Sequence, residues 1–85
     1  SGGIGVLAQS QCIGVCSGNY FTNLIIAIAS RLASNIYSQN NYSTGTLPAY
    51  GLQAYYSSTI GKFTTDQPTG STANEDAQCG GRIII

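Results

Sequence analysis

The stretch from Ser17 to Gly51 constrains the fold more than any other part of the sequence. Its apolar side chains recur at the spacing expected for one face of an α-helix. These residues are Phe21, Leu24, Ile25, Ile28, Leu32 and Ile36. The pattern predicts an amphipathic helix from about Tyr20 to Ser38, with Ser17 or Asn19 as its N-cap.

A second, shorter helix is predicted from Leu47 to about Ser58. Thr46 can cap this helix, and Pro48 lies in its first turn, where the missing N–H of proline leaves no helical hydrogen bond unmade. The residues between the two predicted helices are polar and are expected to form a loop.

Short strands, or an extended arm, are predicted at Gly5–Ala8 and Ile13–Val15, and Cys79–Ile85 is typical of a turn that leads into a strand. No internal repeat is recognisable. A chain of 85 residues makes one domain, so we expect residues 1–85 to form a single small domain. The ending Ile83–Ile85 indicates a strand cut short, and hence a sequence truncated at its C-terminus.

The low charge of the chain argues against two classes of partner. Charged residues make up 7% of the sequence and the net charge is zero, whereas charged residues form about 25% of ordinary soluble domains. A nucleic-acid interface needs clustered cations to displace phosphate counterions, so no nucleic-acid partner is expected. No segment reaches the run of about 18 apolar residues that a membrane-spanning helix needs, so no membrane span is expected.

The cysteines and one sequence triplet favour a secreted protein. Three cysteines, Cys12, Cys16 and Cys79, imply in a secreted chain one disulfide with a free thiol, an intermolecular bridge or a missing partner; in a cytosolic chain all three would be buried thiols. A Cys12–Cys79 disulfide would close a loop of roughly 70 residues and stabilise the fold by on the order of 4 kcal/mol. Asn41 begins a glycosylation triplet within the polar segment, which we expect to be a surface loop.

Nothing in the sequence indicates catalysis. The chain has no histidine, which excludes Ser-His-Asp and Cys-His arrangements. Glu75 and Asp76 are adjacent, so their side chains diverge instead of facing a shared substrate, and Asp66 is the only other carboxylate. Cys12 and Cys16 lack further ligands at the spacing of a zinc site. We therefore expect a protein that is not an enzyme and that uses no metal and no cofactor.

Several short motifs, taken in order, resemble the plant cysteine-rich domain of ginkbilobin, of cysteine-rich receptor-like kinases and of plasmodesmata-located proteins. Cys12 precedes Ser17–Phe21, similar to the family's opening of a long helix; Ala49–Gly51 matches an Ala-Tyr-Gly element; and Cys79–Ile83 is similar to a late cysteine, glycine-rich turn, arginine and strand. The chain departs from the family where its C-x8-C-x2-C hallmark would lie. Tyr55, Thr64 and Gln67 occupy those three positions.

This resemblance implies an α+β fold, with two helices packed on a small antiparallel sheet and a Cys12–Cys79 bridge as its disulfide. Ginkbilobin-type members are secreted antifungal defence proteins of plants that bind mannose or mannan. Arg82 matches their sugar-binding arginine, and Gln11 could substitute for an asparagine whose position falls on Ile13. The resemblance therefore predicts a secreted, mannose-binding lectin with Arg82 and Gln11 at its carbohydrate site.

Two alternatives remain at this point. The very low charge, the abundance of Asn, Ser and Thr, and the Ile83–Ile85 edge are also typical of a structural or self-assembling subunit of a filament or coat. In addition, Ile13–Gly18 is similar to the opening strand of plant β-1,3-glucanases, in which case the chain would be a fragment of a much larger barrel. The oligomeric state separates a monomeric lectin from an assembling subunit, and the sequence leaves it open.

Overall fold

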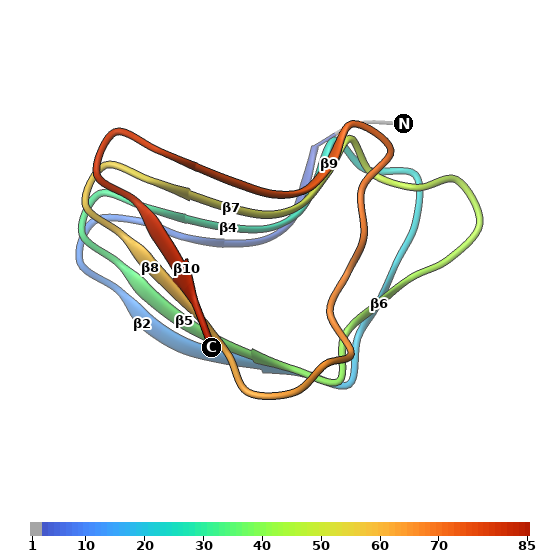
Figure 1. Cartoon of the computed structure of the whole chain (residues 1–85), viewed down its shortest axis with the longest axis horizontal. Coiled ribbons are helices and arrows are strands. Elements are labelled where there is room, and N and C mark those ends of the chain that lie inside the picture. The colour runs from blue at the N-terminus through green and yellow to red at the C-terminus, as the bar shows by residue number, and fades with distance from the viewer. Residues whose placement is uncertain (1–2) are drawn as a thin grey trace.

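The chain forms short β-strands joined by tight corners, and none of the described residues, 3–85, is helical. In the computed structural model these strands follow one another around a common axis, so that the chain makes four successive turns of a β-solenoid (Figure 1). The predicted α+β fold with two helices on an antiparallel sheet is therefore wrong. The structure contains parallel sheets instead.

Each solenoid turn contributes one strand to each of two four-stranded sheets. The first sheet contains β1 (Ile4–Ala8), β4 (Ile26–Arg31), β7 (Tyr50–Tyr55) and β9 (Ala73–Gln78), in that order. The second sheet contains β2 (Ile13–Ser17), β5 (Asn35–Gln39), β8 (Thr59–Lys62) and β10 (Arg82–Ile84), in that order. A small third sheet pairs β3 (Tyr20–Phe21) with β6 (Tyr42–Ser43). All these pairings are parallel, and the molecule measures 31 × 22 × 17 Å.

The strand pairing reveals a structural repeat that the sequence did not show. Ile4 pairs with Ile26, Ile26 with Tyr50 and Tyr50 with Ala73, so successive turns contain 22, 24 and 23 residues. Residues at equivalent positions of successive turns form a column along the axis. Because most columns mix different residue types, the repeat is one of backbone geometry and has little sequence identity to make it recognisable.

The segment that joins the two large sheets has the same length in every turn. Nine residues separate Ile4 from Ile13, Ile26 from Asn35, Tyr50 from Thr59, and Ala73 from Arg82. The stretch that leads from each second-sheet strand back to the first sheet, which we call the return arc, varies. It takes 13 residues from Ile13 to Ile26, 15 from Asn35 to Tyr50 and 14 from Thr59 to Ala73.

A pair of left-handed residues turns the chain from the first sheet to the second. These corner pairs are Ser10–Gln11, Leu32–Ala33, Tyr56–Ser57 and Cys79–Gly80. A left-handed conformation costs a non-glycine residue roughly 1–2 kcal/mol. Hydrogen bonds between successive corners offset this cost: Gln11 N donates to Leu32 O at 3.0 Å, and Ala33 N donates to Tyr56 O at 2.9 Å. The corners therefore stack in register with the strands.

Aliphatic columns fill the space between the two large sheets. Ile28 and Leu52 occupy adjacent turns of one column, and Ile36 and Ile60 occupy adjacent turns of another; all four are almost completely buried. Phe21 closes the core from the side of the third sheet. Each aliphatic side chain packs on its equivalent in the next turn as well as across the core, which holds the turns in register.

The predicted helices fail because their apolar residues belong to different sides of the solenoid. Within the helical stripe of residues 21–36, Phe21 and Ile28 do enter the core, but Ile25 and Leu32 are 52% and 47% exposed. The second predicted helix is instead β7 followed by a left-handed corner. The strands predicted at Gly5–Ala8 and near Ile13, and the turn into a strand at the end of the chain, are confirmed.

Candidate functional site

The two residues predicted to bind carbohydrate lie at opposite ends of the solenoid. Gln11 is an exposed corner residue of the first turn, and Arg82 is exposed at the start of β10 in the fourth turn. Three strand spacings separate these turns, about 14 Å along the axis. The structure therefore does not bring the two side chains together around one sugar ring.

The predicted disulfide is wrong for the same geometric reason. Cys12 precedes β2 in the first turn and Cys79 lies in the corner of the fourth turn; both are exposed free thiols. About 14 Å along the axis is twice the Cα separation of roughly 7 Å beyond which two cysteines cannot be bridged. The fold is stabilised by its stacked strands, with no disulfide among Cys12, Cys16 and Cys79.

Asn41, the candidate glycosylation residue, is completely buried at a corner of the return arc. Its Nδ2 donates hydrogen bonds to Cys16 O at 2.9 Å and to Ser38 Oγ at 2.8 Å, and its Oδ1 accepts one from Asn19 N at 3.0 Å. A glycan on Nδ2 would have to break these contacts. The same cluster holds the buried Cys16, whose burial raises its thiol pKa while hydrogen bonds with Asn19 and Asn41 oppose that shift.

The end of the solenoid formed by the third and fourth turns contains a cavity of about 470 Å³. Its lining includes Leu52, Lys62, Phe63, Gln67, Glu75 and Ile85. Glu75 belongs to the column of Val6, Ile28 and Leu52, so an acidic residue occupies a core-facing position in the last turn. The apolar column of the first sheet therefore ends at Leu52 in the third turn.

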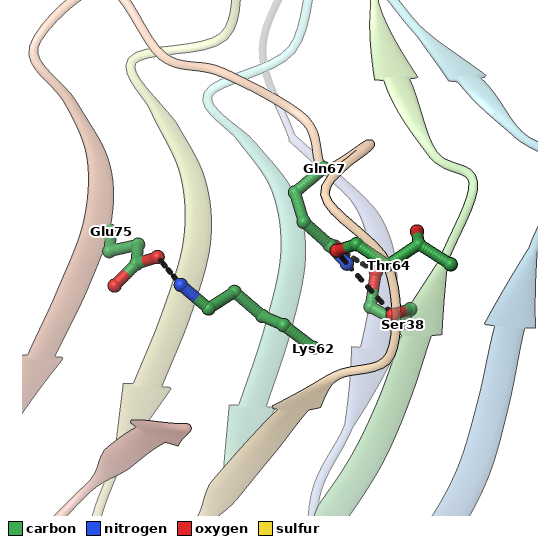
Figure 2. Close-up of polar contacts among 5 residues, drawn as sticks. All are labelled: Ser38, Lys62, Thr64, Gln67 and Glu75. Carbon is green, nitrogen blue, oxygen red and sulfur yellow. Dashed lines mark hydrogen bonds and ion pairs between the residues drawn. The ribbon is translucent and has the colours of Figure 1, made fainter. Parts of the chain in front are cut away.

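An ion pair crosses this cavity between the two large sheets. Lys62 Nζ, at the end of β8, donates to Glu75 Oε2 of β9, as Figure 2 shows. Lys62 continues the column of Cys16 and Ser38, so both charges occupy positions that are filled by uncharged residues in earlier turns. The pair is partly exposed, and such pairs add little to stability. Its effect is to neutralise two charges at the end of the core.

A second polar contact fixes the return arc beside the same cavity. Gln67 Nε2 donates to Ser38 O at 2.8 Å and to Thr64 O at 3.0 Å, and Ser38 Oγ donates to Gln67 Oε1 at 2.6 Å (Figure 2). The side chain of Gln67 therefore ties the third turn to the buried Ser38 of the second.

The opposite end, formed by the first turn, carries no charged side chain. A cavity of about 200 Å³ there is lined by residues that include Val6, Ala8, Gly14, Cys16 and Ile36. Ile13 and Val15 of β2 also line it, and their side chains are 77% and 68% exposed. No charged side chain occurs before Arg31 in the sequence. One end of the solenoid thus carries no charged side chain, and the other carries the Lys62–Glu75 ion pair together with the exposed Arg82.

Comparison of the chain with protein-family models, curated proteins and solved structures finds no match.

Within residues 3–85, no group of three or more His, Cys, Asp or Glu side chains is placed to hold a metal ion. The same part of the chain contains no helix that is long and apolar enough to cross a bilayer. Lys62 and Glu75 were not singled out as a pair from the sequence, because only the strand register brings them to the same cavity. Knowing the number of residues in each turn would have placed Lys62 and Glu75 at the same end of the core.

A hydrogen-bonded cluster covers the outer surface of the first sheet. Arg31 Nη2 donates to Gln53 Oε1 at 2.6 Å, Gln53 Nε2 donates to Asp76 Oδ2 at 3.3 Å, and Tyr55 Oη donates to Asp76 Oδ2 at 2.8 Å. Burial raises the pKa of Asp76, but hydrogen bonds from Tyr55, Gln78 and Gln53 outweigh it, so this pKa lies below its ordinary value. The hydrogen bond to Asp76 is the main cause that raises the pKa of Tyr55 to about 12, and burial is the second cause.

The shifted pKa values of Tyr55 and Asp76 predict that this pair stabilises the fold near neutral pH and stops doing so in acid and in strong alkali. The Tyr55 contribution is complete below the ordinary tyrosine pKa of about 10 and is lost as the pH rises through about 12. The Asp76 contribution is complete above its ordinary pKa and is lost as the pH falls through the lowered value. We expect an ultraviolet titration of the tyrosines to show a last component near pH 12. Tyr55→Phe should remove this component and Asp76→Asn should move it to lower pH; its persistence in Tyr55→Phe would contradict the assignment.

Proposed function

We propose that this chain is a structural subunit that lengthens a β-solenoid by stacking copies strand to strand. The observation that carries the proposal is the pair of open sheet ends. Among the described residues, β1 and β2 at one end, and β9 and β10 at the other, have a neighbouring strand on one side only. An unpaired strand edge is a template for pairing with a strand of another chain.

The first turn lacks the features by which proteins block such pairing. Edge strands are usually protected by charged side chains, prolines, bulges or a covering loop. In this chain β1 and β2 contain neither a charge nor a proline, and Ile13 and Val15 expose apolar side chains beside the open edge. These features favour strand addition at this end over a solvated edge.

Carbohydrate binding, which the ginkbilobin-type resemblance implies, stays a prediction with less support. It depends on Arg82 and Gln11, which lie about 14 Å apart along the axis. A mannan column tests it directly: retention of the wild type and loss of retention in Arg82→Ala would support a sugar site. The stacking proposal predicts equal elution of the two proteins.

Assembly is tested by sedimentation velocity and by electron microscopy across a range of protein concentrations. We expect species well above 8.8 kDa that grow with concentration, elongated particles in micrographs, and a fibre-diffraction reflection near 4.8 Å from stacked strands. A monomer at millimolar concentration would contradict the proposal.

A matched pair of variants connects assembly to the open end. Gly14 lies in β2 beside the first-turn cavity, and a Cβ added there meets no atom within 4 Å. Gly14→Asp should therefore leave the monomer folded but bury an unpaired carboxylate in any stack, so that assembly is lost. Leu47→Asp makes the same charge change on the exposed return arc and should assemble as the wild type does. Equal assembly by both variants would exclude this end as the interface.

A further inference from the structure

We infer that copies join head to tail, with β10 of one copy pairing in parallel with β2 of the next, so that Ile83 lies over Gly14 and Ile84 beside Val15. The inference rests on the proposed function and adds the partner surface, the polarity and the register. The open ends of the solenoid, described above, provide four independent reasons for it.

Strand direction fixes the polarity of the joint. Every strand pair within the molecule is parallel. Joining two first turns with their cores in line would place β2 against β2 in opposite directions, and the two sheets would no longer continue. Only the fourth turn of one copy on the first turn of the next extends both sheets. Such a contact uses two different surfaces and does not close on itself, so it generates a filament.

The constant nine-residue segment between the sheets fixes the register. Because Ala73 and Arg82 have the same spacing as Ile4 and Ile13, both sheets can continue at once. In this register the fourth corner, Cys79–Gly80, lies over the first corner of the next copy. A slip by one residue would also turn the core-facing side chains of one sheet outward.

The shapes of the two ends complement each other at the core. Gly14, Ile36, Ile60 and Ile83 form one core-facing column, which begins with a glycine beside a cavity and ends with an isoleucine. Head-to-tail stacking places Ile83 between Ile60 of its own copy and the space above Gly14 of the next. On the outer surface, Ile84 and Val15, 48% and 68% exposed, become neighbours in a second column. Burial of these apolar groups stabilises the joint.

The charges at the joint are compatible with stacking. Glu75, the core-facing charge of the fourth turn, is already paired with Lys62 of its own copy. Asp76 accepts hydrogen bonds from Tyr55, Gln53 and Gln78. Arg82 of β10 is exposed and continues the column that begins with Ile13, so stacking would place it over Ile13 of the next copy. Residues 3–25, which include the whole first turn, carry no charge, so stacking brings no like charges together.

Disulfide trapping tests the polarity and the register. Cys12 and Cys79, both exposed, are first replaced by serine, while the buried Cys16 is kept. Val15→Cys and Ile84→Cys are then introduced together. Within one chain these positions lie three turns apart, about 14 Å, so they cannot bridge. Across the joint they become direct partners about 4.8 Å apart, within the range of a disulfide. Mild oxidation should produce a ladder of covalent oligomers on a non-reducing gel.

The control pair is Val15→Cys with Arg82→Cys in the same background, which the proposed register places two residues out of line and beyond about 7 Å. We expect no ladder from this pair. A ladder from it in place of the 15/84 pair would overturn the register, and dimers from Val15→Cys alone would overturn the polarity. Absence of any cross-link in a protein that still sediments as oligomers would overturn the joint while leaving assembly intact. A monomer in sedimentation would instead contradict the proposed function itself.

Discussion

Gly51→Ala should abolish folding or lower the free energy of unfolding by at least about 3 kcal/mol, the upper range for overpacking a core. A Cβ at Gly51 would lie 2.1 Å from Pro68 O and 2.8 Å from Asn74 O. Both atoms belong to the backbone, and Gly51 is buried in β7, so neither can move without shifting the third and fourth turns. Urea denaturation followed by circular dichroism measures the change. Dilute protein should be used, because assembly would add to apparent stability.

Gly14→Ala is the matched control for this substitution. Gly14 also lies within a strand, but its added Cβ would meet no atom within 4 Å. Its free energy of unfolding should change by no more than about 0.5 kcal/mol, as for a surface substitution. If the two alanine variants unfold at the same urea concentration, then the close approach of the return arc to β7 does not limit the packing of the fold.

Asn41→Ala is expected to lower the free energy of unfolding by on the order of 3 kcal/mol, because each buried polar group left without a partner costs about 1–3 kcal/mol. The substitution removes the side-chain partner of Cys16 O and of Asn19 N, and it also removes one of the two hydrogen bonds of Ser38 Oγ, which keeps its bond to Gln67. Cys16 and Ser38 lie near the ends of β2 and β5, and Asn19 follows β2 at the corner. The measurement is again urea denaturation, with backbone hydrogen exchange to locate the loss.

Asn35→Ala provides the comparison on the neighbouring strand. Asn35 lies at the start of β5, and its side-chain amide makes no hydrogen bond among the described residues. We expect a change within about 0.5 kcal/mol. A loss in Asn41→Ala no larger than that in Asn35→Ala would show that water satisfies the corner groups, and that the asparagine cluster does not hold the turns together.

The sequence predicted the strands whose patterns are local and misassigned those whose apolar residues also fit a helix. Gly5–Ala8 and Ile13–Val15 are rich in apolar residues and too short for a helix, and the structure confirms a strand at each. Ile25 and Ile28 are three residues apart and suggested one helical face, yet only Ile28 is buried. A corner with positive φ at Leu32 and Ala33 ends the strand, and neither residue type signals that conformation.

The candidate site was less predictable because it depends on contacts between successive turns. Arg82 and Gln11 were selected by resemblance, and the structure separates them. The partners that do meet, such as Lys62 with Glu75 and Tyr55 with Asp76, lie 13 and 21 residues apart. They become neighbours only when the number of residues in each turn is known. That number is set by backbone corners, which leave little trace in residue identity.

The unequal lengths of the return arcs have an evolutionary consequence. Since the nine-residue segment through each corner is constant while the arc takes 13, 15 or 14 residues, insertions and deletions on the arc side leave the pairing of both large sheets unchanged. That side is free to diversify, in length and in exposed chemistry, under selection that holds the other two sides fixed. Whole turns can likewise be duplicated or lost without redesigning the rest, because each turn contacts only its neighbours. A protein built this way can change its length and its surface by separate mutational routes.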